Sequence, residues 1–277
     1  MENTAVLNKT HSLDSQLKRP RWRQISWQKV LPWIVPLTLL VTWQAVVSFG
    51  WVASSTLPSP LAVIQDGIGL IVDGTLPKNI SISLYRATMG LLIGGSIGFL
   101  LGFVNGLSTH MRALTDSSIQ MLRNIPHLSL IPVVILTLGI GEIAKISLVA
   151  VGVMFPVYIN TFHGIRSVDP ELIEMGRSYG LSRQALFTKI IFPGALPTIL
   201  MGLRYALGVM WTTLIVAETM AADSGIGYMA TNAQNFMDME TILLCIVIYA
   251  LLGKVSDLIA KNIETLALGW QQQKGVH

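Results

Sequence analysis

Residues 174–193 read EMGRSYGLSRQALFTKIIFP, a polar and basic segment between two long apolar segments. Just upstream, Asp169 and Pro170 favour a helix start, because aspartate caps free backbone amides and proline suits the first helical position. Gly180 is expected to end this helix, since glycine readily adopts the left-handed conformation that closes many helices. Ser182 is expected to cap a second helix that ends with the segment. The sequence therefore predicts two short helices that meet at a glycine, each too short to cross a bilayer.

Four positions in this segment carry a recognisable spacing. It resembles the signature of the membrane subunits of bacterial ABC importers, in which E-A-A is followed by three residues, Gly, nine residues and I-x-L-P. The positions that match are Glu174, Gly180, Ile190 and Pro193. The sequence departs from the pattern at Met175, Gly176 and Phe192, where the family has two alanines and a leucine.

In that family, this loop docks into a groove on a separate ATPase subunit. The resemblance implies that five residues couple the chain to such an ATPase: Glu174, Arg177, Gly180, Ile190 and Pro193. Glu174 would make a charged contact, either with the partner or with Arg177 on the same helical face. The alternative is an ordinary helical loop between two membrane spans.

The composition is that of an integral membrane protein. Of the 277 residues, 52% are hydrophobic and only 12% are charged, and the mean hydropathy is +0.59. A soluble domain carries about 25% charged residues. The single cysteine, Cys245, excludes a disulfide framework or a cysteine metal site within one chain. The net charge of +4 comes mostly from clusters beside apolar segments, which indicates membrane topology and not nucleic-acid binding.

The sequence shows no motif for catalysis or for a bound cofactor. It contains neither G-x-x-x-x-G-K-[ST], which cradles ATP phosphates, nor H-E-x-x-H, which binds zinc. We therefore expect this chain to be non-enzymatic and to bind no metal and no cofactor. The resemblance to ABC importer subunits implies that a partner uses the ATP. Residues 225–230 fit G-x-G-x-x-A, but no buried strand precedes them, so a turn is predicted. His127 is expected to make a polar packing contact; a proton carrier or metal ligand is the alternative.

The apolar segments predict an all-α membrane protein with six transmembrane helices. Their expected bounds are 30–49, 81–107, 118–138, 143–162, 196–222 and 241–263. Pro126 and Pro132 should break the third helix, and Pro156 should kink the fourth. Polar residues and glycines interrupt residues 61–73, which are interpreted as a surface helix in an outer loop, with part of a span as the alternative.

Positively charged residues predict the orientation. Lys and Arg are concentrated in four segments: an N-terminal arm (1–29), a short turn (107–117), the polar loop (164–195) and the tail (264–277). Cytoplasmic segments carry such an excess, so both termini and the polar loop are expected in the cytoplasm. The transporter domain should cover residues 80–263. Residues 30–49 are nearer to a full span than to the apolar part of a signal peptide, so an uncleaved first helix is preferred.

Five glycines lie four residues apart in the second predicted span. They are Gly90, Gly94, Gly98, Gly102 and Gly106. A four-residue repeat keeps small residues on nearly one stripe of a helix, and such stripes let helix backbones approach closely in membranes. This helix is therefore predicted to lie at the packed centre of the bundle. The alternative is glycine that is merely tolerated in a membrane helix.

Two positive charges lie inside predicted spans. Arg204 and Lys254 would be costly at that depth unless they face a cavity or a partner. We expect them to make the inner half of a translocation path electropositive for an anion. Equally, Lys254 could pair with Asp257 while Arg204 binds carbonyl groups at a helix end. Glu218 is expected to form a structural ion pair, with Arg86 as the candidate partner.

The chain from the first span onward also resembles the permeases of nitrate, taurine and aliphatic sulfonate importers. The segments that carry this are 57–60 (LPSP), 121–127 (MLRNIPH), 155–161 (FPVYINT), 215–219 (IVAET) and 224–228 (SGIGY). The RNIPH version looks closest to the sulfonate branch. The resemblance implies a type I ABC importer permease fold. It also implies a homodimer in the plasma (inner) membrane, two cytoplasmic ATPase subunits and an extracytoplasmic solute-binding protein.

Two other function classes fit the sequence less well. A secondary transporter or channel would need its own coupling sites, usually several intramembrane acids or an internal repeat. Only Glu218 is a clear intramembrane acid, and no repeat is visible. A membrane-embedded enzyme would need a nucleophile with a base partner, which the sequence does not show.

Overall fold

A computed structural model describes residues 27–270, and every regular element among these residues is a helix. The predicted N-terminal arm therefore falls almost entirely outside the described residues. Contacts divide the chain into two units, Met1–Leu61 and Ala62–His277. In the first unit, helix α2 covers Trp27–Ser48, where the first span was predicted. The apolar part of this helix, Ile34–Ser48, is shorter than the length needed to cross a bilayer. The first transmembrane helix therefore stays a prediction.

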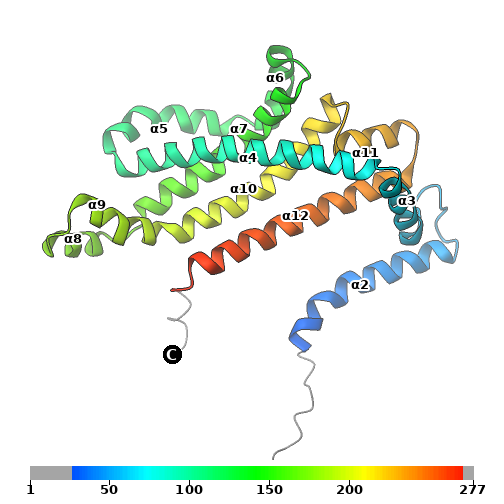
Figure 1. The fold of residues 1–277 in the computed structure, drawn as a ribbon, viewed down its shortest axis with the longest axis horizontal. Coiled ribbons are helices and arrows are strands. Elements are labelled where there is room, and N and C mark those ends of the chain that lie inside the picture. Colours follow the sequence, from blue (N-terminus) through cyan, green and yellow to red (C-terminus); the bar gives the residue numbers. More distant parts are fainter. Residues whose placement is uncertain (1–26, 271–277) are drawn as a thin grey trace, which may run out of the picture. The chain divides into compact units, whose positions relative to one another are not determined.

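The second unit is a bundle of helices (Figure 1). Its elements are α3 (Pro60–Val72), α4 (Thr75–Leu107), α5 (Thr109–Asn124), η1 (His127–Leu130), α6 (Ile131–Leu138), α7 (Glu142–Arg166), α8 (Pro170–Ser178), α9 (Arg183–Leu186), η2 (Phe187–Ile191), α10 (Phe192–Ala221), α11 (Ile226–Asn235) and α12 (Met239–Ala267). Helix α7 packs against both α4 and α10, while α12 lies against α10 and α11. The core of this bundle is apolar and consists of Ala87, Val149, Val153, Val157, Ala206, Met210, Trp211 and Leu214.

Four helices among the described residues are long and apolar enough to cross a membrane. They cover Thr75–Leu107, Glu142–Arg166, Arg183–Met220 and Met239–Ala267. A fifth span exists if the bent pair Ser117–Asn124 and His127–Leu138 is counted as one. The structure thus supports four or five of the six predicted spans. Helix α3, at the predicted surface helix, is a separate short helix and packs against α12 through Gly67 and Leu244.

The third predicted span is not one straight helix. Its two halves meet at 83°. Ile125, just before Pro126, has an extended backbone (φ −74°, ψ 121°), because the proline ring disfavours helical geometry in the preceding residue. The turn predicted at 107–117 is also mostly wrong. Helix α5 already begins at Thr109, because the Ser108 side chain accepts a hydrogen bond from the Met111 amide at 3.3 Å.

The segment between the last two spans contains a further helix. The turn predicted at residues 225–230 is instead the start of α11, with Gly225 at its N-cap and a positive φ of 105°. Among the described residues, no strand precedes this glycine spacing. The amides at this helix start are bound by side chains of α4 and α10, which are described below.

Candidate functional site

The five glycines of α4 all lie buried against α7. A Cβ atom at Gly94 or Gly98 would overlap the carbonyl oxygen of Ala150 or Met154, respectively. At Gly102 it would lie 2.6 Å from the Tyr158 carbonyl oxygen. At Gly90 and Gly106 it would collide with the side chains of Val149 and Ile165. Missing side chains therefore let the α4 backbone touch the α7 backbone.

Gly98→Leu is expected to abolish stable folding, because its side chain would need the space that the α7 backbone occupies. Gly95→Leu is the matched control, since a Cβ there meets nothing within 4 Å. We expect inserted, monodisperse protein for Gly95→Leu and little or none for Gly98→Leu, measured by membrane yield and size-exclusion chromatography. A stable and active Gly98→Leu protein would show that α4 does not need this close approach.

The polar loop forms an elbow of two short helices. At its start, Asp169 accepts a hydrogen bond from the Glu171 amide at 2.9 Å. Gly180 follows α8 with a φ of +74°, and Ser182 accepts a hydrogen bond from the Ala185 amide at 3.3 Å. These caps are the ones that the sequence predicted. We call residues 169–191 the elbow.

The second helix of the elbow does not end at Pro193, contrary to the prediction. Arg183–Met220 is instead one helical rod of 38 residues. Residues Phe187–Ile191 form a π-turn, in which the Phe192 amide donates to the Phe187 carbonyl oxygen. This shift in hydrogen bonding places Pro193 in the first turn of α10, where a missing amide donor is tolerated. The elbow is therefore joined to a membrane span without an intervening loop.

The structure separates the five predicted coupling residues into two groups. Glu174, Arg177 and Gly180 are exposed. Ile190 and Pro193 are half-buried, and Ile190 packs against Gly176, where a Cβ would lie 2.6 Å from its Cδ1 atom. Among the described residues, neither Glu174 nor Arg177 makes an ion pair within 4.0 Å, so the expected alternative pair between them is not formed.

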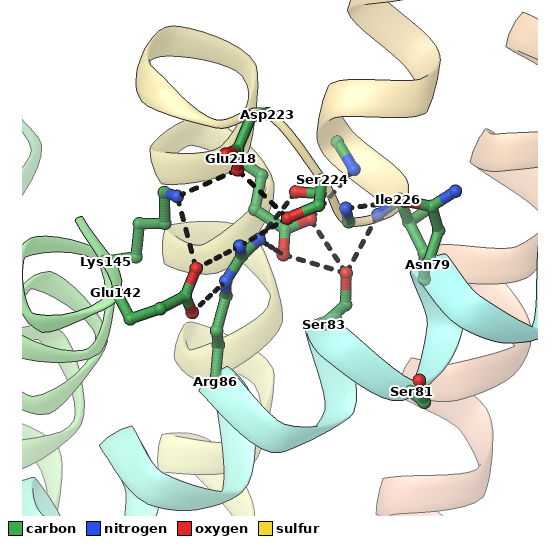
Figure 2. A network of polar contacts seen from close by, with 12 residues as sticks. Asn79, Ser81, Ser83, Arg86, Glu142, Lys145, Glu218, Asp223, Ser224 and Ile226 are labelled. Atoms are coloured by element: carbon green, nitrogen blue, oxygen red, sulfur yellow. Dashed lines mark hydrogen bonds and ion pairs between the residues drawn. The ribbon is translucent and has the colours of Figure 1, made fainter. Parts of the chain in front are cut away.

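A buried polar network lies at the opposite end of α10 (Figure 2). At its centre, Arg86 of α4 is fully buried and uses its whole guanidinium group. Nη1 binds the Glu218 carboxylate at 2.8 Å and the Ser224 carbonyl oxygen at 2.6 Å. Nε and Nη2 bind the two Glu142 oxygens at 2.7 and 2.5 Å, and Nη2 also reaches Ser224 Oγ at 2.9 Å. The predicted Arg86–Glu218 ion pair is confirmed.

Glu218 is equally buried and is hydrogen-bonded from three other directions. Its carboxylate accepts from Ser83 Oγ at 2.8 Å, from the Gly227 amide at 2.9 Å and from the Tyr249 hydroxyl at 3.0 Å. The amide of Ile226 donates to Ser83 Oγ at 2.9 Å. The network therefore joins α4, α7, α10 and α12 to the first amides of α11.

Lys145 and Asp223 lie at the edge of this network. Lys145 Nζ is 3.5 Å from Glu142 and 3.9 Å from Asp223. Asp223 is exposed in the loop before α11, and its pKa is lowered by a hydrogen bond from its own amide, by one from Ser224 and by the charge of Lys145. Sequence reasoning missed most of this network. A signal was present, because Asn79, Ser83 and Arg86 lie on the same face of α4 as the glycines.

Arg204 and Lys254 do not face the membrane centre as isolated charges. Arg204 Nε is 2.7 Å from Asp257 and its Nη1 is 3.9 Å from Glu264, while Lys254 Nζ is 3.8 Å from the other Asp257 oxygen. The alternative in which Lys254 pairs with Asp257 is thus confirmed. Arg204 also pairs with Asp257, and not with carbonyl groups at a helix end as that alternative expected. Both cations stay accessible, with 46% and 66% of their side chains exposed.

A cavity of about 630 Å³ opens beside Arg204. It is lined by Met201, Arg204, Tyr205, Gly208, Val209, Thr212 and Asp257. Its wall is one face of α10 together with Asp257 of α12, so a solute here would contact the rod that begins at the elbow. His127, at the break between α5 and α6, lies 3.1 Å from Thr213 Oγ1, the polar contact that was expected. Among the described residues, no three His, Cys, Asp or Glu side chains are placed to hold a metal ion.

Comparison with known proteins gives a consistent result. The family described as binding-protein-dependent transport system inner membrane component matches residues 90–267. The chain is 52% identical to the putative aliphatic sulfonates transport permease protein SsuC of Escherichia coli (strain K12), over 87% of this chain and 92% of the relative. It is 38% identical to the protein described in the same words from Bacillus subtilis (strain 168), over 98% and 97%.

A solved structure is similar in fold. It is that of an amino acid ABC transporter, and it matches 73% of this chain and 95% of its own chain with a TM-score of 0.58. The sequence identity is only 19%, so this likeness concerns the arrangement of helices alone. The matched part is consistent with the all-helical bundle described above.

Proposed function

The chain belongs to the family of binding-protein-dependent transport system inner membrane components, and from this membership we propose that it forms the translocation path of an ATP-driven importer for aliphatic sulfonates. The similarity to two sulfonate permeases carries the choice of substrate. A taurine or nitrate permease is the alternative within the family. A secondary transporter or channel is the alternative outside it.

The proposed assembly is the one that membership of this family implies. It has no phosphate-binding loop for ATP. A separate cytoplasmic ATPase, in two copies, would supply the energy, and an extracytoplasmic solute-binding protein would deliver the anion. Two copies of this chain would form the path in the inner membrane, with both termini in the cytoplasm. The exposed Glu174 and Arg177 of the elbow support a docking surface for the ATPase.

Uptake by proteoliposomes tests this proposal. The chain is reconstituted with its ATPase and binding protein, and entry of labelled ethanesulfonate, taurine or nitrate is measured. We expect ethanesulfonate uptake that needs ATP, the ATPase and the binding protein. Uptake that persists without the ATPase would favour a secondary transporter or channel, and preferential uptake of taurine or nitrate would change the substrate.

Neutralising both cations beside the α10 cavity should slow uptake. Arg204→Gln with Lys254→Gln removes the ion-pair partners of Asp257 and Glu264, so the local charge becomes more negative and repels an anion. We expect lower sulfonate uptake with normal binding of the ATPase. Lys78→Gln is the control, since Lys78 is exposed and makes no ion pair within 4.0 Å among the described residues. Unchanged uptake in the double variant would remove these residues from the path.

A further inference from the structure

A second cavity lies where the elbow meets the end of α4. Its volume is about 550 Å³, and it is lined by Leu107, Arg177, Leu181, Arg183, Leu186, Phe187 and Ile191. Figure 1 shows α8 and α9 at the same end of the bundle as the last turn of α4. The lining combines two guanidinium groups with five apolar side chains. Of these lining residues, only Arg177 belongs to the surface proposed for the ATPase.

The two arginines of this cavity are available for an anion. Arg177 and Arg183 are exposed, and neither makes an ion pair within 4.0 Å among residues 27–270. The cavity lining contains no carboxylate. Guanidinium groups bind phosphate oxygens through paired, charge-assisted hydrogen bonds. A phosphate group therefore matches the charged part of this cavity.

The apolar part of the cavity adjoins the end of α4, one of the helices long and apolar enough to cross a membrane. Leu107 is the last residue of α4 and is exposed, while Phe187 packs edge-to-face on Phe103 of the same helix at 5.3 Å. Leu186 is buried beneath them. An apolar group that enters from the membrane side would stay in contact with apolar side chains from Leu107 to the elbow. Free phosphate has no such group, whereas a phospholipid has one.

We propose that this cavity binds an anionic phospholipid, with its phosphate between Arg177 and Arg183 and its acyl chain against Leu107 and Phe187. Basic pockets at the cytoplasmic ends of membrane helices bind anionic headgroups in this way. The lipid would join the elbow to the bilayer, and Arg177 would lie at the boundary between this site and the surface proposed for the ATPase. This inference rests on the proposed cytoplasmic orientation of the elbow and does not depend on which solute the chain carries.

Retention of lipid by the purified complex tests the proposal. The full chain with its ATPase is reconstituted into vesicles of equal parts phosphatidylglycerol and phosphatidylcholine, extracted with mild detergent and analysed by native mass spectrometry. We expect bound phosphatidylglycerol in the wild type. Arg183→Gln should reduce its retention by about tenfold, since a hydrogen bond to a charged group is lost, and Arg177→Gln with Arg183→Gln should abolish it. Lys189→Gln, an exposed residue of the elbow outside the cavity, should retain the lipid.

Several results would overturn the proposal. One is equal retention of phosphatidylglycerol by the wild type and the double variant, and another is retention of phosphatidylcholine as strong as that of phosphatidylglycerol. Displacement of the lipid by millimolar inorganic phosphate alone would show a site for the free anion. Lipid that is present only after the ATPase has been removed would show that the ATPase fills the cavity.

Discussion

Arg86→Met is expected to destabilise the protein by about 3–5 kcal/mol, because removal of one partner leaves the other charge of a buried pair uncompensated. Both side chains of the Arg86–Glu218 pair are fully buried. The substitution also removes the donors to Glu142 and to the Ser224 carbonyl oxygen. The measurement is the thermal unfolding midpoint of the purified protein, together with its yield in the membrane.

Two controls separate the buried charge from a general loss of arginine. Arg204→Met removes an arginine whose ion pair with Asp257 is partly exposed, and it should lower stability much less. In Arg86→Met with Glu218→Gln, the uncompensated charge is gone, so part of the lost stability should return. If Arg86→Met unfolds at the same temperature as the wild type, the network does not hold the ends of these helices together.

Gly180→Val is expected to abolish sulfonate uptake while membrane insertion stays normal. A Cβ at this position would meet nothing within 4 Å, so space does not limit the substitution. The backbone limits it, because a φ of +74° costs a residue with a Cβ about 1 kcal/mol or more, and a β-branched residue more still. The elbow would then change shape, and the proposed ATPase surface with it.

The control for the elbow is Gly180→Asn, because asparagine tolerates the left-handed conformation better than other residues with a Cβ. It should keep most of the uptake. Glu174→Lys, which reverses an exposed charge, should also abolish uptake and either release the ATPase or uncouple its turnover from substrate. Binding of the ATPase is measured by co-purification and its turnover by phosphate release. Normal transport by the Gly180→Val protein would show that the ATPase binds this chain at another surface.

Local signals predicted the elbow well. Asp169 and Ser182 cap the two short helices and Gly180 separates them, since capping depends on a few neighbouring atoms that the sequence specifies directly. The long apolar helices followed from length and composition in the same way. The glycine repeat also predicted that α4 makes a close helix contact, because residues four apart lie on the same side of a helix.

Features that depend on distant contacts were predicted less well. A proline at position 193 usually ends a helix, but the π-turn of residues 187–191 lets the helix continue, and no local residue pattern announces it. The sequence suggested a break at Pro126 but not its angle of 83°, which packing decides. The polar network brings together Glu142, Glu218 and Ser224 from three separate segments. Of its contacts, the sequence predicted only the ion pair between Arg86 and Glu218.

The helical rod from Arg183 to Met220, which includes the π-turn and Pro197, has a mechanical consequence. Its 38 residues correspond to a length of about 57 Å at roughly 1.5 Å per residue. A displacement of the elbow end by about 5 Å would therefore tilt a helix of this length by about 5° about its far end. That far end carries Glu218, which Arg86 fixes to α4 and α7. The rod can thus pivot about the Arg86–Glu218 ion pair when its elbow end moves. The π-turn, with its looser hydrogen bonding, is the point at which the helix can bend.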